Sequence, residues 1–216
     1  MGLAELIEDV VKVKSNSRVR KLVEKRVEEF IKMKEADENK WFEELVFCIL
    51  TANSSAKIGL KAIEKLKKEK ALLEGPIEKV EEVLRKVGHR YAKKRAEYII
   101  LARKLIPGLK RRIISIKGIN NKRMWLVQNV MGIGMKEASH FLRNVGYFDV
   151  AIIDRHILKI LSGYDIIDKT FNKRTLTIKR YLKIENILKK IAKSVDLKPG
   201  ILDLYLWYMS TGKVLK

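Results

Sequence analysis

The sequence predicts an all-helical protein. Apolar residues recur three or four positions apart in most windows, which is the period of helices with one buried face. Only three prolines and twelve glycines interrupt the 216 residues, so few positions break a helix. A chain of this length can bury a substantial core, either as one domain or as two small lobes.

The helical period predicts eleven helices. In chain order they cover residues 3–13, 17–34, 41–52, 56–67, 76–87, 92–106, 122–130, 135–145, 155–161, 181–194 and 199–211. Pro76 and Pro199 fall in first turns, where the missing N–H of proline breaks no hydrogen bond. After the helix 135–145, an apolar, strand-like segment leads to Asp154.

The charge of the chain predicts a polyanionic partner. It has 47 Lys and Arg against 26 Asp and Glu, a net charge of +21, which favours nucleic acid over a membrane surface. A thermophilic Lys- and Glu-rich surface is the alternative, but it should be nearer to charge balance. Basic residues interleaved with Tyr91 and Tyr98 suit phosphate binding and base stacking, whereas any one of them can simply lie on a solvated helix face. This basic region contains Arg85, Lys86, Arg90, Lys93, Lys94, Arg95, Arg103, Lys104, Lys110, Arg111 and Arg112.

Cysteine content and hydropathy exclude several classes of protein. Cys48 is the only cysteine, so the chain has no intrachain disulfide and no four-cysteine zinc or iron-sulfur site. It lies in an apolar run and is expected to be a buried thiol. No apolar stretch reaches the length of a membrane span, and the N-terminus is amphipathic rather than a signal peptide. We therefore expect a soluble, intracellular protein.

A helix-hairpin-helix over about 122–145 is the most informative stretch. Gly132 and Gly134 flank Ile133 between two predicted helices. Glycines allow a tight turn, and we expect successive N–H groups to be exposed at the start of the second helix, where they bind a phosphate. The pattern is weak by itself, since many such turns only join helices.

Lys136 and Asp154 are the candidate reactive groups. Lys136 follows the turn directly, and a cationic neighbourhood with partial desolvation favours the neutral amine that a nucleophile requires. Asp154, eighteen residues later, is placed to cap the next helix. The same carboxylate is suited to stabilising a cationic sugar-like transition state. Ordinary roles for the two residues are a solvated lysine and an N-cap.

The run G-I-G-M-K, followed by the aspartate of I-I-D-R-H-I, resembles the helix-hairpin-helix DNA glycosylases. Lys136 resembles the lysine of the bifunctional members, which also cleave the strand. Met131 stands where many relatives have proline, and the missing cysteine cluster departs from the iron-sulfur branches. The segments G-I-G-M-K-E-A-S-H-F-L-R-N-V-G and T-G-K-V-L-K make the chain most similar to the archaeal type-2 8-oxoguanine DNA glycosylases.

The resemblance implies roles for further residues. Lys136 would be the Schiff-base nucleophile and Asp154 the assisting carboxylate. His140 would lie against the extruded base and Trp207 would stack on it, with Asp203 and the terminal Lys216 also at the base. For His140 and Trp207 the ordinary alternative is a place in the core.

Two loops resemble the segments with which related glycosylases enter the duplex. Asn53 would fill the hole left by the flipped nucleotide, although a helix C-cap is an equally good reading. One of His89, Arg90 or Tyr91 would wedge the opposite strand, and the sequence does not decide which.

Together these features predict two helical lobes with a DNA-binding cleft. The central lobe covers 38–148, and the second combines 1–37 with 149–216. The predicted activity is removal of 8-oxoguanine from double-stranded DNA by a monomeric glycosylase with AP lyase activity, located in the cytoplasm and nucleoid. No cofactor is required, although a structural monovalent cation can sit at the hairpin. The alternatives are a glycosylase for another oxidised base and a non-catalytic helix-hairpin-helix DNA-binding protein.

Overall fold

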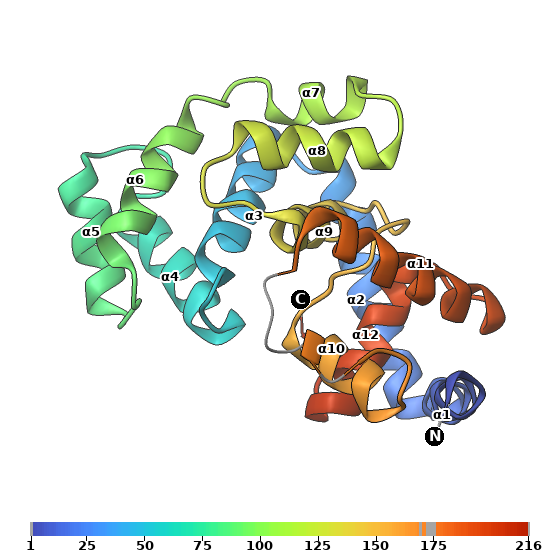
Figure 1. Ribbon diagram of the computed structural model, residues 1–216. Helices are drawn as coiled ribbons and strands as arrows, with labels where there is room; N and C mark the ends of the chain where they lie inside the picture. The colour runs from blue at the N-terminus through green and yellow to red at the C-terminus, as the bar shows by residue number, and fades with distance from the viewer. Residues whose placement is uncertain (1, 169, 172–175, 216) are drawn as a thin grey trace. The chain divides into compact units, whose positions relative to one another are not determined.

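The computed structural model describes residues 2–168, 170–171 and 176–215, and twelve helices lie in these ranges (Figure 1). They are α1 (Leu3–Ser15), α2 (Ser17–Glu35), α3 (Glu38–Thr51), α4 (Ala56–Lys68), α5 (Ile77–Lys86), α6 (Ala92–Arg103), α7 (Leu109–Ser115), α8 (Ile119–Asn129), α9 (Met135–Asn144), α10 (Arg155–Gly163), α11 (Ile178–Ser194) and α12 (Pro199–Thr211). The described ranges contain no β-strand, which confirms the all-helical fold class. None of these helices is both long and apolar enough to cross a membrane.

The chain folds into two units, each of which packs mainly against itself. The central unit is Met33–Val145, and the terminal unit combines Met1–Lys32 with Gly146–Lys216. Each unit is described by itself below.

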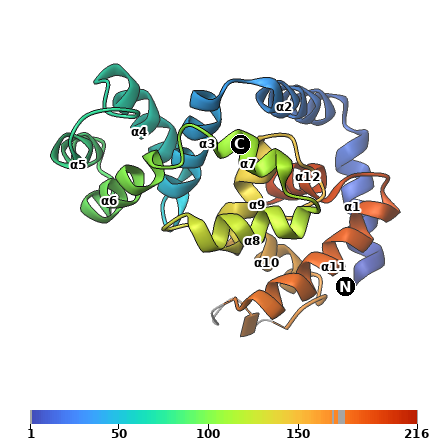
Figure 2. The same ribbon diagram turned by 90° about the horizontal axis from the view of Figure 1, so that it is seen from above.

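The central unit is built around α3. This helix contacts α4, α6, α7 and α9, and almost every residue from Trp41 to Thr51 is buried, which explains the unbroken apolar run from Leu45 to Leu50. The ring of Trp41 meets Phe141 of α9 edge-on at 5.8 Å, and its Nε1–H donates to the Met33 carbonyl. On the other side of the unit α4, α5 and α6 lie side by side, as both ribbon views show (Figures 1 and 2).

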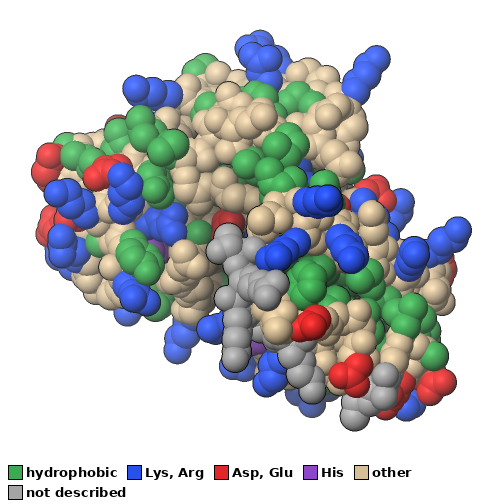
Figure 3. All heavy atoms as spheres, in the orientation of Figure 1, with side chains coloured by type: hydrophobic (Ala, Val, Ile, Leu, Met, Phe, Trp, Pro, Cys, Tyr) green, Lys and Arg blue, Asp and Glu red, His purple; other side chains and the backbone are tan. Residues whose placement is uncertain are grey.

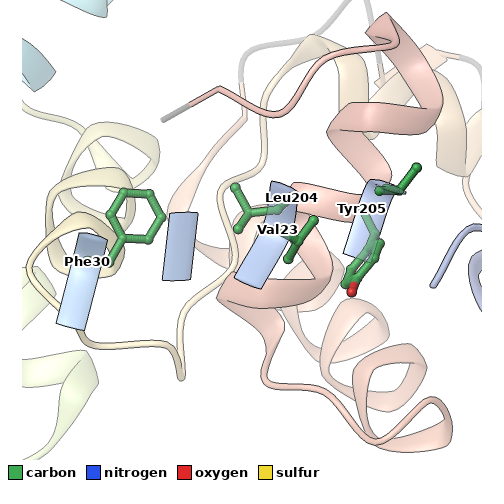
Figure 4. Close-up of a cluster of buried hydrophobic side chains, with 5 residues drawn as sticks. Val23, Phe30, Leu204 and Tyr205 are labelled. Atoms are coloured by element: carbon green, nitrogen blue, oxygen red, sulfur yellow. The ribbon is translucent and has the colours of Figure 1, made fainter. Parts of the chain in front are cut away.

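The terminal unit is built around α12, which contacts α1, α10 and α11. Its other neighbour is α2, because Val19, Val23 and Phe30 form a buried cluster with Leu204 and Tyr205 of α12 (Figure 4). Burying side chains of this size contributes about 1.5–3 kcal/mol each, so the cluster joins the N-terminal helices to the C-terminal ones.

The structure differs from the predicted elements in two places. Residues 109–115 form α7, a short helix that the sequence pattern did not predict. Its seven residues make only two helical turns, which is too short to show a clear apolar repeat. Gly108, directly before it, has a φ of 130° and separates it from the preceding segment. The strand-like segment before Asp154 is an irregular loop, since its apolar side chains are buried without strand pairing.

Candidate active site and nucleic-acid interface

The hairpin turn between α8 and α9 requires glycine at its first position. Gly132 has a φ of 84°, which side chains rarely adopt. A Cβ added there would lie 2.4 Å from Cδ2 of Tyr98 on α6, so the ring of Tyr98 packs directly on the turn. Ile133 is buried, as expected for the residue between two hairpin glycines.

Two of the backbone N–H groups of the turn are already bonded within the protein. Ile133 N–H donates to the Val130 carbonyl at 3.2 Å, and Gly134 N–H donates to Oε2 of Glu137 at 3.3 Å. The expectation of successive exposed N–H groups was therefore wrong for this pair. In the described chain no acceptor is bonded to the N–H groups of Gly132, Met135 and Lys136, and these are the ones open to an anion.

Lys136 lies in the first turn of α9 with 26% of its side chain exposed. Its Nζ is 3.1 Å from Oε1 of Glu137, whose side chain is 14% exposed. One carboxylate thus contacts both the turn and the lysine, through different oxygens. Sequence reasoning missed Glu137. The pattern of an N-cap followed three residues later by glutamate, a capping box, would have identified it.

His140 lies one helical turn after Lys136 and is buried. Its ring packs edge-on against Phe47 of α3, with 5.6 Å between centroids. The structure therefore places His140 against the core of the central unit, on the same helix as the lysine.

His89 and Arg95 are buried and support the two loops that resemble duplex-entering segments. His89 Nε2–H donates to the Leu50 carbonyl at 2.9 Å, and its Nδ1 accepts the Tyr91 N–H at 3.3 Å. Burial lowers the pKa of His89, and the nearby Arg95 adds to this effect. The neutral imidazole with its proton on Nε2 makes both bonds, so His89 acts as an internal brace of the loop.

Arg95 and Tyr98 extend this bracing to the hairpin. The buried Arg95 guanidinium donates to the Ala52 carbonyl at 2.7 Å and lies 5.5 Å from the ring centroid of Tyr98, which in turn packs on Gly132. Burial lowers the pKa of Arg95. The hairpin, the α3–α4 loop and the α5–α6 loop are therefore connected by contacts within the central unit.

The exposed tips of these loops are Asn53, Arg90 and Tyr91. Asn53 has a φ of 57°, a left-handed conformation that asparagine tolerates better than most residues. It follows the end of α3 without acting as its C-cap, which is Ala52. The Arg90 guanidinium lies over the Tyr91 ring at 5.2 Å from its centroid.

In the terminal unit, Asp154 is the N-cap of α10, as its position predicted. Its Oδ1 accepts the N–H groups of His156 at 2.8 Å and Ile157 at 3.0 Å. No described residue bonds to Oδ2. One oxygen of the carboxylate therefore fixes its orientation, and the other stays open.

The loop before Asp154 is held by two buried residues of α11. The Tyr181 hydroxyl donates to the Ala151 carbonyl at 2.6 Å and accepts the Ile153 N–H at 3.3 Å. Glu185 Oε1 accepts the Ala151 N–H at 3.1 Å. These bonds replace the strand pairing that the loop lacks, and they fix the backbone that carries Asp154.

Trp207 contacts the helix that Asp154 caps. Its ring meets the His156 ring at 4.5 Å between centroids, and His156 Nδ1 is 2.8 Å from the Ser210 hydroxyl. Trp207 Nε1–H is buried, and no described residue accepts a hydrogen bond from it. Asp203 is buried one turn earlier on α12, and Lys216 lies outside the described residues.

Comparison with known proteins decides the family. A family model described as 8-oxoguanine DNA glycosylase matches residues 23–197. The chain belongs to the 8-oxoguanine DNA glycosylase family. The 8-oxoguanine DNA glycosylase/AP lyase of Korarchaeum cryptofilum is 48% identical, with 100% of both chains covered. That of Methanocaldococcus jannaschii is 47% identical, covering 98% of this chain and 99% of the relative.

Solved structures of this glycosylase family are similar over the whole chain. The M. jannaschii enzyme in complex with a 15mer DNA containing 8-oxoguanine has a TM-score of 0.92 at 47% identity, covering 98% of this chain and 100% of that one. The Thermotoga maritima enzyme has a TM-score of 0.90 at 42% identity, covering 99% and 100%. These matches identify the hairpin of this chain as that of a DNA glycosylase.

The glycosylase uses several members of its basic region for internal contacts. Arg103 donates to four backbone carbonyls, those of Ala71, Leu72, Glu74 and Gly75, and Lys110 donates to the Ala36 carbonyl. Arg85, Lys86 and Lys94 pair with Glu81, Glu82 and Glu97. Elsewhere Lys and Arg side chains are spread over the visible face rather than gathered in one patch (Figure 3). Of the basic region, Arg90, Lys93, Lys104, Arg111 and Arg112 make no ion pair with a described residue.

Proposed function

We propose that this chain removes 8-oxoguanine from DNA and cleaves the strand at the resulting site, with Lys136 as nucleophile and Asp154 as the assisting carboxylate. Membership of the 8-oxoguanine DNA glycosylase family supports the activity. The position of Lys136, in the first turn after the hairpin and on the carboxylate of Glu137, is the observation that supports the mechanism.

The reaction would begin with the neutral amine of Lys136 attacking C1′ of the flipped deoxyribose. The C1′–N9 bond breaks, the base leaves with the bonding electrons, and it takes up a proton. Asp154, through its open Oδ2, stabilises the positive charge that develops on the sugar. Loss of a proton from nitrogen and ring opening give the Schiff base. Removal of a C2′ proton then expels the 3′ phosphate by β-elimination.

Base recognition is assigned to four residues on the basis of family resemblance. His140 and Trp207 would contact the extruded base, and the buried Trp207 Nε1–H offers a donor that no described residue uses. Asp203 and Lys216 would complete the contacts. The proposal for Lys216 rests on family resemblance alone.

Binding of double-stranded DNA is assigned to the hairpin turn and to the α3–α4 and α5–α6 loops of the central unit. The open N–H groups of Gly132 and Met135 would bind a phosphate, while Gly134 shapes the turn and supplies its own N–H to Glu137. Asn53 would enter the duplex from one loop. Arg90 and Tyr91 would do so from the other, since the buried His89 braces that loop instead.

No cofactor enters this proposal. The described residues contain no group of three or more His, Cys, Asp or Glu side chains that could hold a metal ion. A monovalent cation at the hairpin stays a prediction, as do a monomeric enzyme and a location in the cytoplasm with the nucleoid.

Borohydride trapping on an 8-oxoguanine duplex tests the mechanism directly. A Schiff base is reduced to a covalent protein–DNA adduct, so wild type should trap and Lys136→Gln should not, while still binding DNA. Lys61→Gln removes an exposed lysine from α4 of the same unit and should trap like wild type. Trapping by Lys136→Gln would overturn the assignment, and so would a wild type that binds the duplex but never traps.

A further inference from the structure

A basic pocket lies beside α7, away from the residues assigned above. Lys104, Arg111, Arg112, Pro107, Ser115 and Trp125 are among its lining residues, and its volume is about 490 Å³. No acidic side chain lines it. All of its lining residues belong to the central unit.

Its three cations have no role inside the described part of the protein. Lys104, Arg111 and Arg112 are exposed and make neither an ion pair nor a side-chain hydrogen bond with a described residue. Their neighbours Arg103 and Lys110 are committed to backbone carbonyls. Glu38 lines a second pocket that shares Arg111 and Ser115, but its carboxylate accepts the N–H groups of Gly108 and Lys110 and pairs with none of the three cations. The three positive charges repel one another, and an anionic ligand would relieve that repulsion.

The remaining lining favours a ligand with a flat apolar part. Trp125 comes from α8 and is partly exposed, whereas Trp41 of the same unit is completely buried. Pro107 and the partly exposed Leu105 add apolar surface beside it. A phosphate suits the cations, and a base suits the indole, with cation–π support from arginine.

We propose that this pocket binds an unpaired nucleotide of a nucleic acid strand, with the phosphate on Lys104, Arg111 and Arg112 and the base on Trp125. The base must be unpaired, because both faces of a base inside a duplex are covered by its neighbours. The pocket would give the protein a contact with single-stranded DNA that does not depend on a damaged base or on Lys136.

Tryptophan fluorescence with undamaged oligo(dT) is the first test. Trp207 is removed as Trp207→Phe, so that quenching at the proposed lesion-base site does not contribute. Oligo(dT) should quench this variant, and adding Trp125→Phe should abolish the quench. An equal quench in both proteins, or an equal quench by a duplex closed at both ends, would overturn the proposal.

Affinity for the same oligonucleotide is the second test, measured by fluorescence anisotropy as a function of salt. Trp125→Leu should weaken binding by about five-fold or more. Arg111→Gln with Arg112→Gln should reduce the salt slope by about 1.4, since each single-strand phosphate contact contributes about 0.7. Arg18→Gln with Lys21→Gln removes the same charge from exposed positions of α2 and serves as the control.

If the pocket variant and the α2 control lose the same affinity and salt slope, the effect comes from net charge alone. That result would overturn the proposal of a specific pocket. Trp125→Leu should still trap on an 8-oxoguanine duplex as wild type does. Failure of this proposal is therefore distinguishable from failure of the glycosylase mechanism, which trapping reports separately.

Discussion

Glu137 Oε1 lies 3.1 Å from Lys136 Nζ, while Oε2 of the same carboxylate accepts the Gly134 N–H. The residue therefore has a structural contact with the turn and an electrostatic contact with the proposed nucleophile. The two contacts can be separated by mutation, because glutamine keeps an acceptor for the N–H but carries no charge.

Glu137→Gln should increase trapping by roughly two- to five-fold, because it removes the ion pair that must break before the Lys136 amine can attack the sugar. Glu137→Ala also loses the cap on Gly134, and should lower the free energy of unfolding by about 0.5–2 kcal/mol. If the glutamine variant binds DNA normally but traps more slowly than wild type, the ion pair with Glu137 holds Lys136 in its reactive position.

The contact between Gly132 and Tyr98 gives a second prediction. Gly132→Ala must accommodate both a positive φ and a Cβ placed 2.4 Å from the Tyr98 ring, so it should destabilise the hairpin and weaken DNA binding. Gly75→Ala is the matched control, since Gly75 has a φ of 87° and no atom within 4 Å of an added Cβ. That control should lose about 1 kcal/mol for backbone strain alone.

Chemical denaturation and DNA binding measure both variants. Adding Tyr98→Ala to Gly132→Ala should recover part of the loss by removing the clash. If the double variant is no better than the sum of its single changes, the packing between ring and turn is not the cause.

The helices were predictable because their residues repeat a local pattern, and the positions of the two proposed reactive groups were predictable because they adjoin that pattern. Lys136 follows a turn that the glycines reveal, and Asp154 precedes a helix that it caps. The contacts of Arg95 were not predictable in this way. Its guanidinium reaches the Ala52 carbonyl across 43 positions, and nothing in the sequence near Arg95 distinguishes it from the neighbouring surface lysines.

The same limit explains why the basic region was assigned too broadly. Arg103 and Arg111 look alike in the sequence, yet Arg103 binds the carbonyls of the α4–α5 loop and Arg111 lines a pocket. Which basic residue is exposed depends on long-range packing. His89 could not be separated from Arg90 for the same reason, since its burial depends on the end of α3.

His89 predicts a pH dependence of stability. Burial lowers its pKa in the folded protein below the usual 6.5, so the unfolded chain binds a proton first as the solution is acidified. Stability should therefore fall as pH drops below about 6.5, and this loss should stop once the folded imidazole is protonated too. Thermal melts between pH 5 and 8 measure it.

His89→Gln keeps an N–H donor for the Leu50 carbonyl but does not titrate. It should be less stable than wild type at neutral pH, and its stability should change less between pH 7 and 5. Parallel pH profiles of the two proteins would show that another group causes the acid sensitivity.

The last prediction concerns the support of Asp154 by Tyr181. Tyr181→Phe keeps the buried ring but removes the hydroxyl that bonds to Ala151 and Ile153, leaving a carbonyl and an N–H without their partner. This should lower the free energy of unfolding by about 1–3 kcal/mol. It should also slow base excision, because the backbone before Asp154 loses two of the hydrogen bonds that hold it in place.

Tyr164→Phe provides the comparison, since it removes another tyrosine hydroxyl of the same unit, one that donates to Asp9 at 2.6 Å. Tyr164 is the C-cap of α10, at the opposite end of the helix from Asp154. Single-turnover excision is measured for both variants at a temperature where each is fully folded. Tyr181→Phe should still excise the base more slowly than Tyr164→Phe when both proteins are fully folded. The reason is that the Tyr181 hydroxyl bonds to the N–H of Ile153, the residue directly before Asp154. Equal excision rates would mean that the cap of α10 alone is sufficient to orient the carboxylate.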